Sequence, residues 1–251
     1  FFKQKTAYEI GTGDWSSDVC SSDLKCFVKR EINNTQNIKE MKNLYIVGAS
    51  GCGREVLNII KDIHAIRGVQ WNIVGFLDDD LQALDSIDCD YQVVGTIKDY
   101  LPQANDVLAL GIASPQVKEK IVAMLKAKGA VFQSIIHPYV ALGRFNTIGE
   151  GAVIYSGFGM TVNIKIGDFC TLLACGLGHD VEVGDFSTIS SWCNIMGHVK
   201  IGNRVFMGGN CSAAPNAVIE DDAYVGVGSV VLRKVKAGKR AFGNPAREME
   251  F

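Results

Sequence analysis

An aliphatic residue recurs at every sixth position between Leu142 and Val231. A period of six fits neither an amphipathic helix, with a period of about 3.6, nor a half-buried strand, with a period of about two. It predicts a parallel β-helix of hexapeptide turns, each of which points one aliphatic side chain inward. The in-phase positions, with a single five-residue step, are Leu142, Ile148, Ile154, Met160, Ile166, Leu172, Leu177, Val183, Ile189, Ile195, Ile201, Met207, Ala213, Ile219, Val225 and Val231.

A second inward position of the hexad carries small residues, including four of the eight cysteines: Cys170, Cys175, Cys193 and Cys211. A tight corner admits only a small side chain, and a free cysteine behaves as a small hydrophobe. We therefore interpret these cysteines as core residues rather than as metal ligands or redox centres. Reduced thiols in turn indicate a cytoplasmic protein.

The composition excludes several functional classes. The chain of 251 residues is 47% hydrophobic and 21% charged, which is typical of a soluble globular protein. Its formal net charge of −2 gives no reason to expect nucleic acid or an anionic membrane as a partner. No apolar run approaches the roughly 20 residues that span a bilayer, so no membrane insertion is expected.

Three segments are predicted: 1–40, 41–137 and 138–251. Residues 1–24 resemble the translation of a sequencing-library adapter, and we interpret them as an artefact. Residues 25–40 are polar and of uncertain origin, so the expected start is Met41.

The segment 41–137 alternates short apolar runs with helical patterns. This alternation predicts a small parallel α/β sheet of Rossmann-like type, followed at about residues 137–141 by the β-helix. The expected strands are 44–47, 74–77, 93–94, 107–110 and 131–136, and the expected helices run to about residue 65 and over 114–128.

A glycine-rich loop joins the first expected strand to the first helix. Gly48, Gly51 and Gly53 give the spacing G-x-x-G-x-G, and acidic residues follow the second strand at 78–80. Such a loop presents backbone N–H groups and a helix N-terminus to a phosphate, which favours a nucleotide or diphosphate ligand. The spacing is not the dinucleotide fingerprint, so an NAD-linked dehydrogenase is not favoured. Alternatively, the glycines only permit a tight turn and close helix–strand packing.

His179 and His198 lie 19 positions apart, which places them on adjacent coils near the same corner of the β-helix. Asp180 follows His179 and can orient an imidazole or stabilise its charged form. A β-helix with histidines also invites comparison with the γ-class carbonic anhydrases. Those need a third histidine and an H-x4-H pair, which this region lacks, so we expect no metal. The residues alone leave open whether His179 is a general base or structural.

The order of MKNLYIVGASGCGREV, FLDDD, the hexads with GLGHDVEVGDF, and FGNPAREM resembles the sialic acid O-acetyltransferase family. That family includes the amino-sugar N-acetyltransferases of bacterial glycan synthesis, and the resemblance covers 41–249. It implies a left-handed β-helix, a homotrimer, and acetyl-CoA bound between neighbouring subunits. It also implies His179 as general base, Asp180 as its acidic partner, and the backbone N–H of Gly197 as oxyanion donor.

The same resemblance implies residues for both substrates. Those for acetyl-CoA are His198, Gly208, Gly209, Gly226, Gly228 and Lys239, and those for the nucleotide-sugar are Gly48, Ser50, Gly51, Asp78 and Asp79. The chain departs from the family at Cys52, at Leu172 and at residues 110–113, which puts a UDP-amino-sugar acceptor in doubt.

The expected function is therefore acetyl-CoA-dependent O- or N-acetylation of a sugar or nucleotide-sugar by direct transfer. The alternatives are an acyltransferase with a different acyl group or a non-sugar acceptor, and a non-catalytic trimer that binds a nucleotide-sugar as a scaffold. We further hypothesise that the five-residue step before His179 reshapes its corner, so that the imidazole projects into the cleft between subunits.

Overall fold

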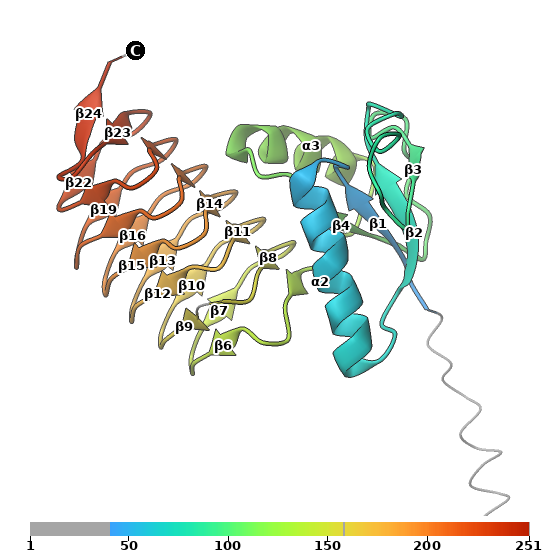
Figure 1. The fold of residues 1–251 in the computed structure, drawn as a ribbon, viewed down its shortest axis with the longest axis horizontal. Helices are drawn as coiled ribbons and strands as arrows, with labels where there is room; N and C mark the ends of the chain where they lie inside the picture. The colour runs from blue at the N-terminus through green and yellow to red at the C-terminus, as the bar shows by residue number, and fades with distance from the viewer. Residues whose placement is uncertain (1–40, 158, 251) are drawn as a thin grey trace, which may run out of the picture. The chain divides into compact units, whose positions relative to one another are not determined.

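The computed structural model describes residues 41–157 and 159–250. The predictions for residues 1–40 lie outside the described residues. An α/β region comes first in the chain and a β-helix follows (Figure 1). Among the described residues, no helix is both long and apolar enough to cross a membrane.

Four parallel strands form the sheet of the first region, in the order β3-β2-β1-β4. Their central residues are buried because helices pack on the sheet; Leu44 and Ile46 of β1 are fully covered. Helix α2 follows the glycine-rich loop directly, and Gly68 ends it with a positive φ of 80°. The bounds are β1 (Asn43–Val47), α2 (Gly51–Arg67), β2 (Asn72–Leu77), β3 (Val93–Gly95), β4 (Asp106–Leu110) and α3 (Pro115–Ala127).

Two glycines of the loop are required by packing. A Cβ on Gly53 would lie 1.8 Å from the carbonyl oxygen of Gly48, so no other side chain fits there. Gly48 itself has a φ of 96°, a left-handed conformation that favours glycine. A Cβ on Gly51, in contrast, would meet only the end of Arg54 at 4.0 Å. The packing explanation therefore accounts for Gly48 and Gly53 and leaves Gly51 for another role.

Three parallel sheets form the faces of the β-helix. The first face contains β5 (Ile135–Ile136), β8 (Val153–Ile154), β11 (Thr171–Leu172), β14 (Thr188–Ile189), β17 (Phe206–Met207), β20 (Tyr224–Val225), β23 (Arg240–Phe242) and an antiparallel β24 (Arg247–Met249). The second face contains β6 (Ala141–Leu142), β9 (Gly159–Met160), β12 (Gly176–Leu177), β15 (Asn194–Ile195), β18 (Ser212–Ala213) and β21 (Val230–Val231). The third face contains β7 (Thr147–Ile148), β10 (Lys165–Ile166), β13 (Glu182–Val183), β16 (Lys200–Ile201), β19 (Val218–Ile219) and β22 (Lys234–Val235).

The predicted fold class, a small parallel α/β sheet followed by a parallel β-helix, is confirmed. Its hexad residues are buried except at the first coil of the stack, where Ile148 is partly buried and Leu142 is exposed. Leu142 is 48% exposed, because its strand β6 has a neighbour, β9, on one side only. The small inward positions are also buried, including Cys170, Cys193 and Cys211.

The expected strand 131–136 is partly wrong: Phe132 forms an isolated bridge to Leu108, whereas β5 pairs with β8 in the β-helix.

Three corners join the faces. The first corner, between the first and second faces, includes turns 173–175, 190–193 and 208–211; the second corner includes 178–181 and 196–199; the third corner, which returns to the first face, includes 167–170, 184–187 and 202–205. The five-residue step falls in turn 173–175 of the first corner, which has one residue fewer than 190–193.

The hypothesis that this step reshapes the corner of His179 is therefore wrong. His179 lies in turn 178–181 of the second corner, which is as long as turn 196–199 above it. The short turn is absorbed before β12, because Leu177 pairs in register with Ile195 and Met160 on either side. Register in the parallel faces holds the coils in step, so only the turn between them can shorten.

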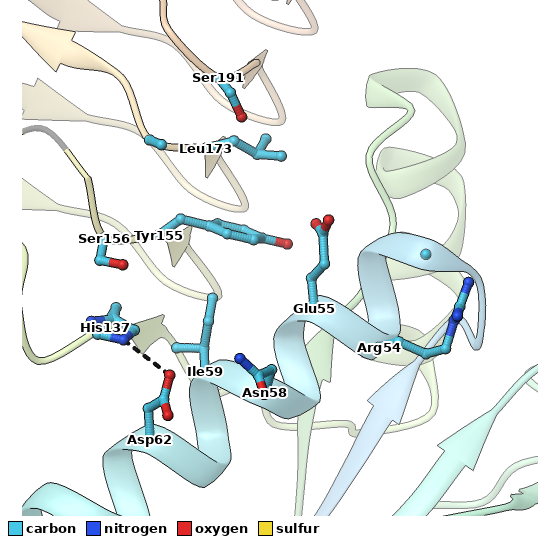
Figure 2. Close-up of a pocket in the computed structure, with 12 residues that line it drawn as sticks. Arg54, Glu55, Asn58, Ile59, Asp62, His137, Tyr155, Ser156, Leu173 and Ser191 are labelled. Atoms are coloured by element: carbon cyan, nitrogen blue, oxygen red, sulfur yellow. Dashed lines mark hydrogen bonds and ion pairs between the residues drawn. The ribbon is translucent and has the colours of Figure 1, made fainter. Parts of the chain in front are cut away.

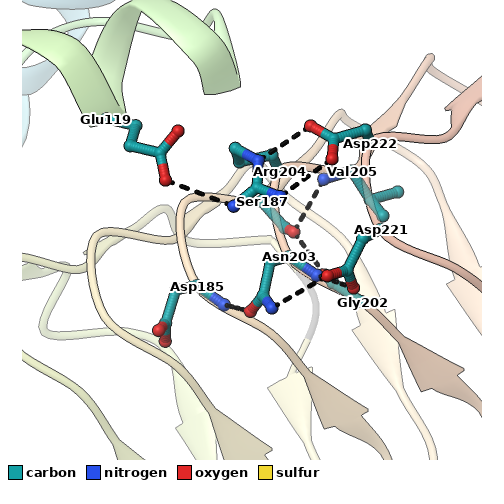
Figure 3. A network of polar contacts seen from close by, with 9 residues as sticks. All are labelled: Glu119, Asp185, Ser187, Gly202, Asn203, Arg204, Val205, Asp221 and Asp222. Carbon is teal, nitrogen blue, oxygen red and sulfur yellow. Dashed lines mark hydrogen bonds and ion pairs between the residues drawn. The ribbon is translucent and has the colours of Figure 1, made fainter. Parts of the chain in front are cut away.

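Helix α3 is anchored to the third corner. The side chain of Lys118 is fully buried and donates hydrogen bonds to Phe169 O at 3.0 Å and Thr188 Oγ1 at 2.9 Å. Arg204 donates to Asp222 at 2.8 Å and to Glu119 of α3 at 3.2 Å (Figure 3). The α/β region is thus fixed to the β-helix by polar contacts as well as by shared apolar core.

Candidate active site

His179 and His198 meet at the second corner. Their rings are edge-to-face with centroids 4.9 Å apart. The backbone N–H of His198 donates to the carbonyl oxygen of His179 at 2.9 Å, so coil stacking fixes their positions. Asp180 has a φ of 59°, the conformation shared by His198 in the next coil. Its Oδ2 lies 2.8 Å from Nδ1 of His179 and 3.8 Å from Nε2 of His198. The sequence prediction that these three residues meet at one corner agrees with this geometry.

The carboxylate of Asp180 sets the tautomer of His179. The hydrogen bond from His179 lowers the pKa of Asp180 below its ordinary value, and the nearby imidazoles add to this effect. An ionised carboxylate can only accept, so neutral His179 carries its proton on Nδ1. Its Nε2 then has a free lone pair. The His179 side chain is 57% exposed, which leaves this nitrogen open to a reactant.

The Nε2 side of the His179 ring lies against Gly197. A Cβ on Gly197 would lie 2.6 Å from Nε2 and 2.5 Å from Cε1, so a larger residue would displace the ring. Among the described residues, no backbone acceptor is found for the N–H of Gly197. A lone pair that can take a proton therefore lies beside a residue whose N–H has no backbone acceptor among the described residues.

A mainly apolar groove of about 540 Å³ runs along the second face toward this corner. Met160, Leu177, Met196 and Gly197 are among the residues that line it. Gly197, which lies against the His179 ring, lines one end of this groove. An extended ligand in the groove would therefore reach Nε2 of His179 and the N–H of Gly197.

A second cavity, of about 520 Å³, lies between α2 and the first corner (Figure 2). Leu173 and Ala174 of the short turn line it, so the five-residue step lies beside this cavity rather than beside His179. The other side chains are mostly polar or aromatic: Arg54, Glu55, Asn58, Ile59 and Asp62 from α2, and His137, Tyr155, Ser156 and Ser191 from the β-helix side.

Some polar side chains that line this cavity have hydrogen-bond partners, and one buried polar atom among the described residues does not. Nδ1 of His137 accepts from the N–H of Tyr139 at 3.1 Å, so Nε2 carries the proton that faces Asp62 at 3.2 Å. Glu55 and the Tyr155 hydroxyl point toward each other (Figure 2), and burial raises the pKa of that tyrosine. Nε of Arg54 is buried and has no hydrogen-bond partner among the described residues. A ligand could supply that partner.

The residues expected to hold a nucleotide-sugar are not all brought together. Asp78 accepts from the N–H of Ala49 at 2.7 Å, and Asp79 accepts from the N–H of Lys98 at 3.1 Å, so both carboxylates fix loops. Gly48 serves packing, as described above, and Ser50 precedes α2 without a side-chain cap bond. Gly51 lines the cavity at the N-terminus of α2.

The residues expected to hold acetyl-CoA are distributed over the β-helix. Gly208, Gly209, Gly226 and Gly228 lie at the first corner, a full face away from His179 in the same chain. Lys239 lies just before β23, 3.6 Å from Glu250. His198 is at the second corner, beside Asp180.

Sequence reasoning missed most of the cavity at the first corner. Two signals in the sequence indicate the two walls of the cavity separately, but not that the walls meet. Tyr155, Leu173 and Ser191 are spaced by 18 residues, one coil, and therefore stack at one corner. Residues 54, 55, 58 and 62 repeat at helical spacing, so they share one face of α2.

The sequence is similar to a described protein family and to a known acetyltransferase. Residues 43–125 match the family described as PglD N-terminal domain. The chain is 29% identical over 237 residues to a GDP-perosamine N-acetyltransferase of Escherichia coli O157:H7, covering 83% of this chain and 97% of that protein.

Two solved structures share the whole fold. One is the acetyltransferase domain of PglB from Neisseria gonorrhoeae in complex with acetyl coenzyme A, with a TM-score of 0.75, 22% identity, and coverage of 83% of this chain and 100% of that one. The other is PerB from Caulobacter crescentus in complex with CoA and GDP-perosamine, with a TM-score of 0.74, 22% identity, and coverage of 83% and 97%. The resemblance to sugar acetyltransferases is thus confirmed, and with it the prediction of an acyltransferase.

Proposed function

We propose that the chain transfers the acetyl group of acetyl-CoA directly to an amine or hydroxyl of a nucleotide-linked sugar. The observation that carries this proposal is the second corner, where Nε2 of His179 lies against Gly197, whose N–H has no backbone acceptor among the described residues. Acyl transfer needs both groups: a base for the acceptor and a donor for the oxyanion. The relatives named above are acetyltransferases, in agreement with this reading.

In the proposed reaction, Nε2 of His179 takes the proton of the acceptor as its nitrogen or oxygen attacks the thioester carbonyl. The Gly197 N–H donates to the resulting oxyanion. Collapse of the tetrahedral intermediate breaks the C–S bond, and the imidazolium returns its proton to the CoA thiolate. Asp180, held 2.8 Å from Nδ1, orients the ring and stabilises its positive charge. No acyl-enzyme forms, which agrees with the burial of the core cysteines.

The cavity at the first corner is the proposed acceptor site. The N-terminus of α2 at Gly51 and the unpartnered Nε of Arg54 suit a phosphate. Glu55, Asn58 and Ser191 offer hydrogen bonds to sugar hydroxyls or an amine.

A homotrimer is the assembly we propose, because the two sites lie on different corners of one chain. In a cyclic assembly, the first corner of one subunit can face the second corner of its neighbour. Acetyl-CoA would then lie between subunits, with Gly208, Gly209, Gly226, Gly228 and Lys239 on one side and His198 on the other. We further propose a cytoplasmic enzyme of bacterial surface glycan synthesis, since the described cysteines are free.

The test is release of the CoA thiol from acetyl-CoA in the presence of UDP-, GDP- and CMP-linked sugars, with the sugar products identified by mass. Acetylated product with at least one sugar supports the proposal. Binding of a nucleotide-sugar without thiol release would favour the alternative of a non-catalytic scaffold. Release with another acyl-CoA or a non-sugar acceptor alone would favour the other alternative.

A further inference from the structure

Three metal-binding side chains converge at the second corner. His179, Asp180 and His198 each offer a ligand atom, and the three atoms lie within 4.8 Å of one another. Counting histidines in the sequence overlooked this set, because the third donor is a carboxylate. Within this set, the carboxylate oxygen of Asp180 lies 2.8 Å from Nδ1 of His179 and 3.8 Å from Nε2 of His198.

These donors suit Zn²⁺. Zinc accepts imidazole nitrogens and carboxylate oxygens at about 2.0–2.2 Å in a tetrahedral arrangement. Such bond lengths place neighbouring ligand atoms a little over 3 Å apart in a tetrahedron. The spacing of 2.8 and 3.8 Å around Asp180 requires only small side-chain rotations to reach it. Because both imidazoles are more than half exposed, water can reach the three residues and complete the coordination.

We propose that His179, Asp180 and His198 form a Zn²⁺ site that switches the transferase off. The inhibitory effect of Zn²⁺ rests on the proposed function of His179 as the general base, whereas the binding of Zn²⁺ does not. Zinc on Nδ1 requires the lone pair of that nitrogen, so the ring proton moves through solvent from Nδ1 to Nε2. The proton count of the ring is unchanged, but Nε2–H can no longer accept the proton of the acceptor. Asp180 is held by the same ion and no longer stabilises an imidazolium.

Binding is tested without turnover. Zn²⁺ affinity is measured by competition with a chromophoric chelator, and Co²⁺ serves as a second probe through the visible absorption of its four-coordinate state. We expect one site per chain at this corner. Asp180→Asn and His198→Gln should each weaken binding by at least about tenfold, as loss of a metal-site partner does.

His64→Gln is the matched control, since His64 lies on α2 beside Trp71 and outside the cluster. It should leave the affinity unchanged. Circular dichroism establishes that each variant is folded. If both cluster variants bind Zn²⁺ as tightly as the unchanged chain, the site is refuted.

Inhibition is tested separately, by transfer of radiolabelled acetyl groups at free Zn²⁺ fixed by a metal buffer, because CoA thiol also binds zinc. Transfer should fall as the site fills and return on addition of a chelator. Full transfer with the site occupied would overturn the switch. A chain that binds Zn²⁺ at these residues but transfers no acetyl group under any condition would refute the proposed function and leave the metal site standing.

Discussion

The first and second corners of the β-helix differ in where their chemistry comes from. The second corner is regular where its histidines lie: turns 178–181 and 196–199 have equal length, and Asp180 and His198 have φ values of 59° and 61°. Its proposed reactivity comes from the side chains of His179 and Asp180, which lie on a turn of the usual four-residue length. The first corner is irregular at 173–175, and what it gains is volume, a cavity of about 520 Å³.

The difference shows what a solenoid does with a missing residue. Parallel pairing on both sides keeps each coil in register, so a shortened turn cannot shift the strand that follows. It can only withdraw the chain from the surface at that point, which hollows the corner. At the first corner the break in period coincides with the cavity, whereas the side chains of His179 and His198 meet where the coils keep their regular spacing.

The largest expected effect comes from removing the base at the second corner. His179→Ala should lower turnover by roughly 10²–10⁴-fold, the usual contribution of a general base. Thermal unfolding should be little changed, because the side chain is more than half exposed. Steady-state kinetics with acetyl-CoA and an accepted sugar measure this, and undiminished turnover would exclude His179 as the base.

A second test displaces the ring without removing it. Gly197→Ala places a Cβ about 2.5 Å from the His179 ring, which must turn away. A catalytic group misplaced by about 1 Å can cost about 100-fold in rate, so kcat should fall by up to that factor. Gly95→Ala is the control, since its Cβ would meet only Leu77 at 3.7 Å, in ordinary contact. Equal kcat for the two variants would contradict the proposed placement of the ring.

The regular parts of the molecule could be predicted from the sequence. Ile189 and Ile195 follow one physical rule, inward burial every six residues, and the meeting of His179 with His198 follows from the length of a coil. The cavity could not be predicted in the same way, because Asp62 and His137 come from elements 75 residues apart. How α2 packs against the first corner is a property of tertiary contacts, and no local pattern in the chain specifies it.

Refilling the short turn should affect the acceptor site alone. Inserting one glycine between Leu173 and Ala174 restores the four-residue length of turn 190–193 and fills part of the cavity. We expect KM for the nucleotide-sugar to rise about tenfold, equivalent to about 1.4 kcal/mol of binding, with KM for acetyl-CoA unchanged. A glycine inserted between Leu232 and Arg233, in another short turn away from the cavity, is the control. A larger rise in KM for acetyl-CoA than in KM for the nucleotide-sugar would contradict the assignment of this cavity to the acceptor.

The third corner should affect turnover least, because it carries α3 and not the proposed chemistry. Burial lowers the pKa of Lys118 from 10.5 to about 8 in the folded chain. Between pH 8 and 10.5 the unfolded chain therefore binds more protons, so folding stability should rise with pH across this window, by up to about 3 kcal/mol. Below about pH 8 both states carry the charge, and Lys118 contributes no pH dependence. Urea unfolding of Lys118→Met should lack this rise, whereas Lys120→Met, exposed on the same helix, should keep it. If the stability of Lys118→Met rises with pH as steeply as that of the unchanged chain, another group titrates in this range. Lys118 would then stay charged among the oxygens that accept its hydrogen bonds.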